Sequence, residues 1–309
     1  MDKCTKTINY EECLRDIVLA DSRFVVITAE NRAAIRNITD SLDGRFIDVG
    51  IAEQAMIGIA AGLALRGRIP VLHALAAFLT MRGFEFIRTD IGISGLPVKL
   101  VGGFPGFLST ANGPTHQALE DVALMRLIPP MQIFCPSDEE DMHIGLRAML
   151  QSPNPCYMRY NDRPPVIEHD PDFQIGKAEV ISQGKDVTIL TYGILLREAL
   201  LARDVLDTCG LSSGVVNLRT LKPIDEGAVL HAASERSLLV TLEDHFQTGG
   251  LYSITCELLM EHHVTARVMP IGLKNRWFKP APLPDILFHE GFTGEKIAET
   301  ILKEFERNA

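Results

Sequence analysis

The first half of the chain alternates between short apolar runs and longer segments whose apolar residues recur every three to four positions. The short runs have the length and composition of strands buried on both faces of a parallel sheet. They cover residues 24–28, 69–75, 97–101, 131–135 and 156–160. The longer segments predict helices at residues 52–66, 81–93, 116–127 and 137–150. The alternation predicts a doubly wound α/β fold.

A polar segment at residues 161–172 interrupts this pattern. It reads NDRPPVIEHDPD, is rich in proline and charge, and lacks periodicity, which is typical of a linker. The alternation then restarts, with strands predicted at 187–191, 215–218, 238–242 and 268–271 and helices at 196–208, 226–233, 251–261 and 294–306. We therefore expect two α/β domains, 1–163 and 173–309, joined by a linker at 164–172.

Composition narrows the classes of function. The formal net charge of the 309 residues is −10 and lysine and arginine form no stripe, which argues against a nucleic-acid-binding surface. The longest apolar stretch, 57–65, is too short to cross a membrane, and the first ten residues lack the apolar core of a secretory signal. The six cysteines show no metal-binding spacing. We expect a cytoplasmic protein that binds neither nucleic acid nor a membrane and holds no metal by itself.

Three segments carry candidate chemistry. Glu53, in the sequence GIAEQ, follows a probable strand end and opens a predicted helix, so it would point into a crevice at the carboxyl edge of the sheet. It could equally complement the helix dipole. His116, in GPTHQ, could carry protons near neutral pH or serve as a structural histidine. Phe78 could stack on a flat heteroaromatic ring or be ordinary core.

The order and spacing of these segments are more specific than each one alone. GIAEQ at 50–54 is followed by AAGLA at 60–64, AAF at 76–78, GPTHQALEDVALMRLIP at 113–129 and PSD at 136–138. This series resembles the pyrimidine-binding domain of transketolases and 1-deoxyxylulose-5-phosphate synthases. GKDVTILTYG at 184–193, NLRTLKPID at 217–225 and EDHFQTGGL at 243–251 resemble the C-terminal domain of the same family. The resemblance covers nearly all of the chain and implies an enzyme that uses thiamine diphosphate.

The resemblance assigns cofactor-binding roles to residues near the first two motifs. In this family the glutamate of GIAEQ forms a hydrogen bond with N1′ of the cofactor's aminopyrimidine, which implies that role for Glu53. Phe78 matches the aromatic residue that stacks on the pyrimidine, and Met81 is expected on the same wall. Ile51 and Arg82 are expected to complete the cofactor contacts. Glu53 and His116 are the implied catalytic residues.

Substrate-binding roles follow from the same resemblance. His116 matches the family histidine that binds substrate oxygens and relays protons to them. Arg159, in CYMRY, matches an arginine that binds a sugar phosphate, because a guanidinium fork suits a phosphate dianion; a surface ion pair is the alternative. Two positions depart from the family. Phe104 stands where transketolases tend to have a histidine, and Asn112 where an aspartate is frequent, which predicts a less polar and less anionic substrate channel.

The family's diphosphate-binding part has no counterpart in the sequence. In transketolases an N-terminal domain with a Gly-Asp-Gly motif binds the diphosphate and its metal, and this sequence contains neither Gly-Asp-Gly nor a GxGxxG or GxxxxGK[ST] loop. The resemblance therefore implies a partner subunit that carries Gly-Asp-Gly and binds most of the Mg²⁺ or Ca²⁺. We expect thiamine diphosphate at the interface of an α2β2 heterotetramer.

The leading interpretation is the C-terminal subunit of a two-chain transketolase, which moves a two-carbon ketol unit from a ketose or ketose phosphate to an aldehyde. Within the same cofactor class, a 1-deoxyxylulose-5-phosphate-synthase-like subunit or a 2-oxo acid dehydrogenase β chain stays possible, and either would decarboxylate its substrate. A non-catalytic, partner-binding subunit is the alternative from another class. A nicotinamide-dependent dehydrogenase would need a phosphate loop that the sequence lacks.

Overall fold

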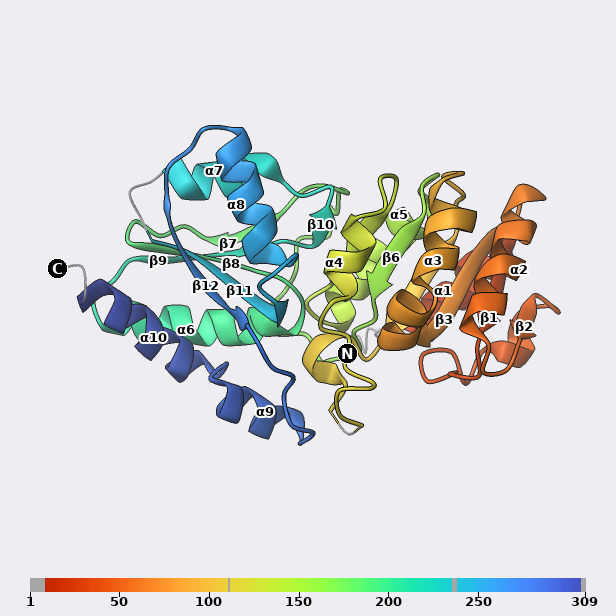
Figure 1. Cartoon of the computed structure of the whole chain (residues 1–309), viewed down its shortest axis with the longest axis horizontal. Helices are drawn as coiled ribbons and strands as arrows, with labels where there is room; N and C mark the ends of the chain where they lie inside the picture. The colour runs from red at the N-terminus through yellow and green to blue at the C-terminus, as the bar shows by residue number, and fades with distance from the viewer. Residues whose placement is uncertain (1–8, 111, 235–237, 307–309) are drawn as a thin grey trace, which may run out of the picture.

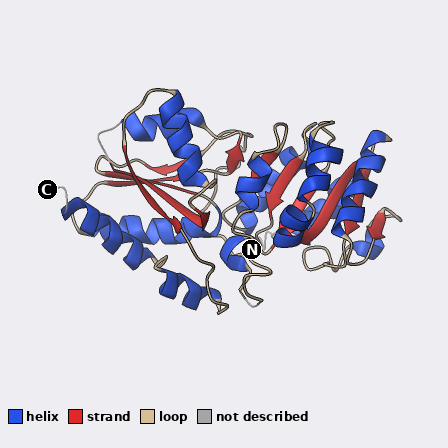
Figure 2. Cartoon of the chain, in the orientation of Figure 1, coloured by secondary structure: helices blue, strands red, loops and turns tan. Residues whose placement is uncertain are grey.

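The computed structural model describes residues 9–110, 112–234 and 238–306, so both outer ends of the predicted domains lie outside the described residues. Two sheets dominate it, one in each half of the chain, and each has helices on both faces (Figure 1). Nearly all strand pairs within the sheets are parallel (Figure 2). The predicted α/β fold class is confirmed.

The first sheet has the strand order β10-β5-β6-β4-β3-β1-β2. Its strands from the first half are β1 (Phe24–Thr28), β2 (Phe46–Asp48), β3 (Ile69–Leu75), β4 (Lys99–Gly103), β5 (Gln132–Phe134) and β6 (Cys156–Arg159). Helices α1 (Tyr10–Ala20) and α5 (Glu139–Gln151) pack on one face, and α2 (Glu53–Leu65) and α4 (Asp121–Arg126) pack on the other. Every residue of β1, FVVIT, is buried, as its unbroken apolar run predicts.

The second sheet has the order β12-β11-β8-β9-β7. Its strands are β7 (Glu179–Ser182), β8 (Val187–Thr191), β9 (Ser213–Asn217), β11 (Leu238–Phe246) and β12 (Arg267–Leu273). Its helices are α6 (Leu196–Thr208), α7 (Glu226–Ser234), α8 (Leu251–Glu261), α9 (Leu283–Glu290) and α10 (Gly294–Glu306). Helices α6 and α10 pack together beneath the sheet in Figure 1, with α7 and α8 above it. The apolar pattern did not predict α1, β7, β10 (Thr220–Lys222) or α9.

Two predicted helices differ from the structure in a way that matters for the site. The segment expected at 81–93 begins at Phe78 and is wound in wide π-turns, as η2 (Phe78–Arg82) and η3 (Ile87–Gly92), around the short α3 (Phe84–Phe86). The helix expected at 116–127 begins only at Asp121. A left-handed Gly113, with φ of +74°, and a hydrogen bond from Ser109 Oγ to the His116 carbonyl (2.7 Å) keep the preceding residues in a loop.

The two halves share structure across the predicted boundary. Strand β10 (Thr220–Lys222) comes from the second half and pairs antiparallel with β5 at the edge of the first sheet. One apolar cluster also contains buried residues of both halves, including Met125 and Ile133 with Tyr192 and Leu251. The predicted linker has neither helix nor strand. The two sheets are therefore parts of one packed body.

Buried charges at the junction reinforce this contact. His169, from the linker, lies 2.9 Å from Asp138 at the start of α5 and 2.8 Å from Glu179 on β7, and its side chain is fully buried. Burial alone would lower the pKa of His169, but hydrogen bonds with Asp138 and Glu179 outweigh it and raise the pKa to about 10. An imidazolium therefore ties the linker to both domains.

The charge on His169 predicts a pH-dependent stability. His169→Gln removes the imidazolium that pairs with the buried Asp138 and with Glu179, although Glu179 keeps its ion pair with Arg219, and should lower the free energy of unfolding by about 3–5 kcal/mol near pH 6. Because the folded-state pKa of His169 is raised, its contribution is fully present below about pH 6.5 and is lost as pH rises through about 10. Urea unfolding at pH 6, 8 and 9.5 should show the difference between wild type and variant shrinking with pH; a pH-independent difference would contradict this.

Candidate active site

Glu53 lies where β2 gives way to α2. The chain turns at Gly50, whose φ of +71° is left-handed, and α2 begins at Glu53 itself. The Glu53 side chain is only 3% exposed, and Arg82 Nη1 donates a hydrogen bond to its Oε2 at 2.9 Å. Glu53 Oε1 has no hydrogen bond within the described residues. One carboxylate oxygen is thus fixed and the other is available to a ligand.

The π-turn of η2 brings Phe78 and Arg82 onto the same side. The Arg82 guanidinium lies 4.2 Å from the centroid of the Phe78 ring, within the range of a cation–π interaction. The His116 ring meets Phe78 edge-on at 4.9 Å between centroids, and Thr115 Oγ1 lies 2.8 Å from His116 Nδ1. A continuous series of contacts therefore joins the carboxylate, the guanidinium, the aromatic ring and the imidazole.

The remaining cofactor and substrate candidates differ in exposure. Ile51 is 75% exposed and Met81 is 37% exposed, so each has apolar surface free for a ligand or a partner. Phe104 follows β4 and is 44% exposed, and Asn112 is exposed in the loop before Gly113. Phe104 has a φ of +55°, which for a phenylalanine stores backbone strain of about 1–3 kcal/mol. Such strain concentrates at functional sites.

The second domain holds the loop that carries Asn112 and His116. Gln117 Nε2 donates to the Phe278 carbonyl at 3.0 Å, and the Ala281 N–H donates to the Thr110 carbonyl at 3.0 Å. Phe278 is itself buried in the core of the second domain. Sequence reasoning missed this support, because the segment before α9 contains no motif that resembles a site. The position of His116 therefore depends on both domains.

Arg159 does not have the placement that phosphate binding requires. Its side chain is buried, Nε donates to Asp121 Oδ2 at 2.9 Å, and Nη1 donates to Asp244 Oδ1 at 2.5 Å. The expectation needed a guanidinium fork free to meet a substrate, but two internal carboxylates already occupy this one. Ion pairing with Asp121 and Asp244 outweighs burial, so the pKa of Arg159 is raised well above its ordinary value.

The EDHFQTGG motif belongs to the same buried region. Glu243 accepts hydrogen bonds from the N–H groups of Leu251 (2.7 Å) and Tyr252 (3.0 Å), so it caps α8. Burial nevertheless raises the pKa of Glu243 to about 8. Its role is therefore to hold α8 against β11. Within the described residues, no three His, Cys, Asp or Glu side chains gather to hold a metal ion, and no helix there is long and apolar enough to cross a membrane.

The chain matches two family models in succession. Residues 5–163 match the transketolase pyrimidine binding domain, and residues 176–297 match the transketolase C-terminal domain. The fold and the gathered Glu53, Phe78 and His116 agree with that assignment. The chain belongs to the transketolase family, and it corresponds to the C-terminal part of a transketolase made as a separate subunit.

Relatives support this assignment, and the first two are similar in length to this chain. The chain is 40% identical, over 96% of its length and 94% of the relative's, to a 6-deoxy-6-sulfo-D-fructose transketolase subunit of Clostridium sp. (strain MSTE9). It is 33% identical, over 85% of its length and 84% of the relative's, to a putative transketolase C-terminal section of Methanocaldococcus jannaschii. It is also 35% identical over 266 residues to the 1-deoxy-D-xylulose-5-phosphate synthase of Dictyoglomus thermophilum, of which it covers 43%.

Solved structures show the same fold. A split-gene transketolase, described as an inactive β4 tetramer, superposes with a TM-score of 0.85 at 32% identity, covering 95% of this chain and 96% of that one. The transketolase of Pichia stipitis superposes with a TM-score of 0.80 at 20% identity, and this chain covers 44% of it. The second likeness is one of fold alone.

The buried position of Arg159 predicts that it stabilises the fold. Arg159→Met leaves Asp121 and Asp244 uncompensated and should lower the free energy of unfolding by about 3–5 kcal/mol. Arg163→Met, which removes an exposed arginine nearby in the sequence, should change it by no more than about 0.5 kcal/mol. Urea unfolding at pH 7 measures both. An Arg159 variant of wild-type stability that instead weakens binding of a phosphorylated substrate would restore the phosphate-binding role.

Proposed function

We propose that this chain is the pyrimidine-binding subunit of a thiamine-diphosphate-dependent transketolase that transfers a two-carbon ketol unit from a ketose to an aldehyde. The observation that carries the proposal is the contact series from Glu53 through Arg82 and Phe78 to His116. It combines a buried carboxylate with one unused oxygen, an accessible aromatic ring and an imidazole. These are the groups that the aminopyrimidine of the cofactor and the oxygens of a sugar require.

The side chains fit the pyrimidine end of the cofactor. Glu53 would use Oε1 to meet the ring nitrogen N1′, while Arg82 holds its Oε2. Phe78, Met81 and Ile51 would supply the apolar contacts to the ring. When bound, thiamine diphosphate supplies the nucleophilic carbon that carries the two-carbon unit. His116 would bind the substrate hydroxyl groups and exchange protons with them, since its ring is half-buried and held by Thr115 and Phe78.

We infer that activity needs a partner subunit. The sequence lacks the Gly-Asp-Gly motif, so the diphosphate and its Mg²⁺ or Ca²⁺ must be held mainly by another chain. Large apolar side chains are exposed on α2, directly after η3 and directly after α4, at Ile59 (41%), Leu65 (71%), Ile93 (73%) and Leu127 (71%). Helix α2 packs against η3, and an exposed apolar surface of this kind is typical of a protein interface. A similar β-type chain is described as an inactive β4 tetramer, which agrees with an active α2β2 assembly.

We infer that the donor is a ketose with an anionic group. One relative is named for 6-deoxy-6-sulfo-D-fructose, and another, 31% identical, is one of the subunits of the apulose-4-phosphate transketolase of Phocaeicola vulgatus. Phe104 and Asn112 make this chain's side of the channel less polar than a histidine and an aspartate would. We therefore expect a substrate with fewer hydroxyl contacts at these two positions than an ordinary pentose phosphate makes.

Replacement of Glu53 tests the proposed cofactor contact. In the complex with the partner subunit, Glu53→Ala should slow exchange of the cofactor's C2 proton and ketol transfer by about 10²–10⁴-fold, because proton transfer by a positioned carboxyl is lost. Deuterium exchange followed by NMR and a coupled ketol-transfer assay measure the two rates. Glu261→Ala, an exposed glutamate at the end of α8, is the matched control and should behave as wild type. Wild-type exchange in Glu53→Ala would refute the assignment.

Titration of the cofactor tests partner dependence. Isothermal titration calorimetry of the isolated chain with thiamine diphosphate and Mg²⁺ should give negligible heat, because the diphosphate end has no binding group here. Addition of the partner subunit should produce saturable binding and activity. Tight cofactor binding by the isolated chain would contradict the proposal. Release of carbon dioxide from pyruvate by the complex, without ketol transfer, would instead favour the synthase-like alternative, which the 35% identity to a 1-deoxyxylulose-5-phosphate synthase keeps open.

A further inference from the structure

The backbone of Phe104 departs from two ordinary preferences. Its φ of +55° lies in the left-handed region, where a phenylalanine side chain crowds its own backbone. Pro105 follows it, and a residue before proline ordinarily takes the extended conformation. A strained conformation of this kind persists only when the structure on both sides of the residue dictates it. The contacts before and after Phe104 therefore explain where its side chain lies.

Before Phe104 the chain is fixed by the first sheet. Strand β4 pairs with β3 up to its last residue, where Gly103 is the register partner of Leu75. The preceding Gly102 is packed so closely that an added Cβ would lie 2.7 Å from the hydroxyl of Tyr157. The end of β4 therefore has little room to shift and relieve the backbone that follows it.

After Phe104 the chain is fixed by the second domain. The short helix η4 (Gly106–Leu108) carries Phe107, whose side chain is fully buried. Its ring meets those of Phe278 and Phe292 edge-on, at 5.2 and 4.9 Å between centroids. Edge-to-face pairs of this kind add to the free energy gained by burying the rings. Phe107 is therefore an aromatic anchor that joins the loop after β4 to the core of the second domain.

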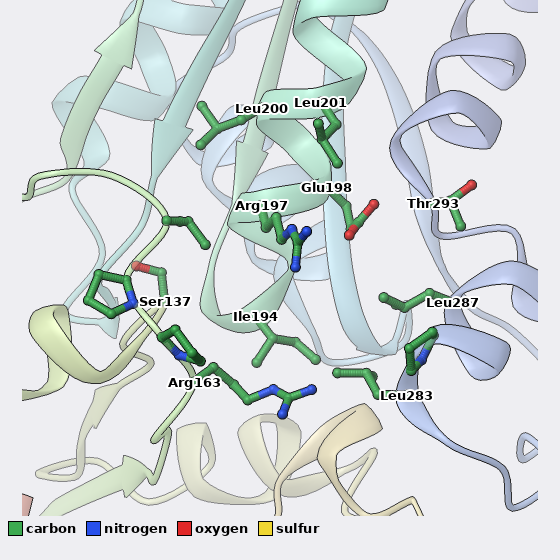
Figure 3. Close-up of a pocket in the computed structure, with 14 residues that line it drawn as sticks. Ser137, Arg163, Ile194, Arg197, Glu198, Leu200, Leu201, Leu283, Leu287 and Thr293 are labelled. Carbon is green, nitrogen blue, oxygen red and sulfur yellow. The ribbon is translucent and has the colours of Figure 1, made fainter.

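Other contacts hold η4 in the same place. The Gly106 N–H donates to the Ala118 carbonyl at 2.9 Å. Helix α9 packs against η4, and its Ile286 is buried in the apolar cluster that contains the anchor. Leu283 and Leu287 of the same helix line the groove drawn in Figure 3. The anchor is thus held by a helix of the second domain as well as by the two rings.

We propose that Phe107 is a positioning residue, which fixes the ring of Phe104 at the substrate channel. The proposal rests on the substrate-binding role proposed above for Phe104, whose side chain is 44% exposed. Because the backbone of Phe104 is held on both sides, packing inside the second domain determines where this apolar ring stands. The second domain thereby influences which donor the first domain accepts, although the buried Phe107 itself touches no substrate.

Glycine and alanine at position 104 test the backbone part of the proposal on the full chain. Phe104→Gly should unfold at a higher urea concentration than Phe104→Ala, because only glycine takes a left-handed φ without strain. With Phe107→Ala added, residue 104 should relax to the extended region. The order should then reverse, because alanine restricts the unfolded chain more than glycine does. The same order with and without the anchor would overturn the proposal.

Two further substitutions make this comparison secure. Phe107→Leu keeps an apolar side chain and should reduce the difference between glycine and alanine, so it replaces Phe107→Ala should that variant fail to fold. Phe134→Leu is the matched control, because Phe134 on β5 is also fully buried and meets Phe173 edge-on at 5.2 Å between centroids. It should lower the unfolding midpoint and leave the glycine variant more stable than the alanine variant.

Kinetics of the complex with the partner subunit test the functional part, with D-fructose 6-phosphate as the donor. Phe107→Leu should raise KM for this donor about tenfold with little change in kcat, because an apolar contact to the bound sugar is lost while the reacting groups stay in place. With Phe104→Ala already present, Phe107→Leu should have no further effect, because the ring through which it acts is absent. An equal rise in KM in both backgrounds would contradict the positioning role.

Exchange of the cofactor's C2 proton separates this proposal from the proposed function. It should proceed at the wild-type rate in the Phe104 and Phe107 variants, because neither change touches Glu53. Absence of exchange in the wild-type complex would refute the proposed function, whereas the urea comparison would still decide whether the anchor sets the backbone of Phe104. Loss of exchange in the Phe107→Leu variant alone would show a general structural role and would overturn the positioning role.

Discussion

The structure depends on one buried arginine at the junction of its domains. Arg159 ends β6 of the first sheet and pairs with Asp121 at the start of α4 and with Asp244 on β11. Three buried charges are stable only when they remain together, because each alone would be costly in an apolar interior. The geometry is tight: a Cβ added at Gly106 would lie 1.9 Å from Asp244 Oδ2. The relative position of the two domains is therefore fixed at this point.

This fixed junction also sets the geometry of the proposed active site. Helix α4 begins at Asp121, five residues after His116, and the loop that carries His116 is held at Thr110 and Gln117 by the Ala281 and Phe278 segment of the second domain. The second domain contributes no side chain to the contact series of Glu53, Arg82, Phe78 and His116. It nevertheless positions the imidazole of His116. The C-terminal domain therefore supports the pyrimidine-binding domain. The π-turn of η2 places Arg82 over the ring of Phe78, and Phe78 contacts the imidazole that the C-terminal domain positions.

The sequence predicted the sheets well, because buried strands such as 24–28 (FVVIT) and 187–191 (VTILT) are short runs of mostly apolar, β-branched residues. It predicted the gathering of Glu53, Phe78 and His116 only through the resemblance of whole motifs. The late start of α4 was not visible, because it is set by tertiary contacts of the preceding loop. Arg159 was misplaced for the same reason, since its partner Asp244 lies far along the chain.

Strand β10 has a consequence for the order in which the protein is made. It completes the first sheet beside β5, yet it follows the linker and three strands of the second sheet, β7, β8 and β9. While the ribosome is still synthesising that stretch, β5 presents an open edge that can pair with other nascent chains. A chain truncated at the linker would therefore keep β5 as an open strand edge that favours aggregation. The two domains are a single unit of biosynthesis.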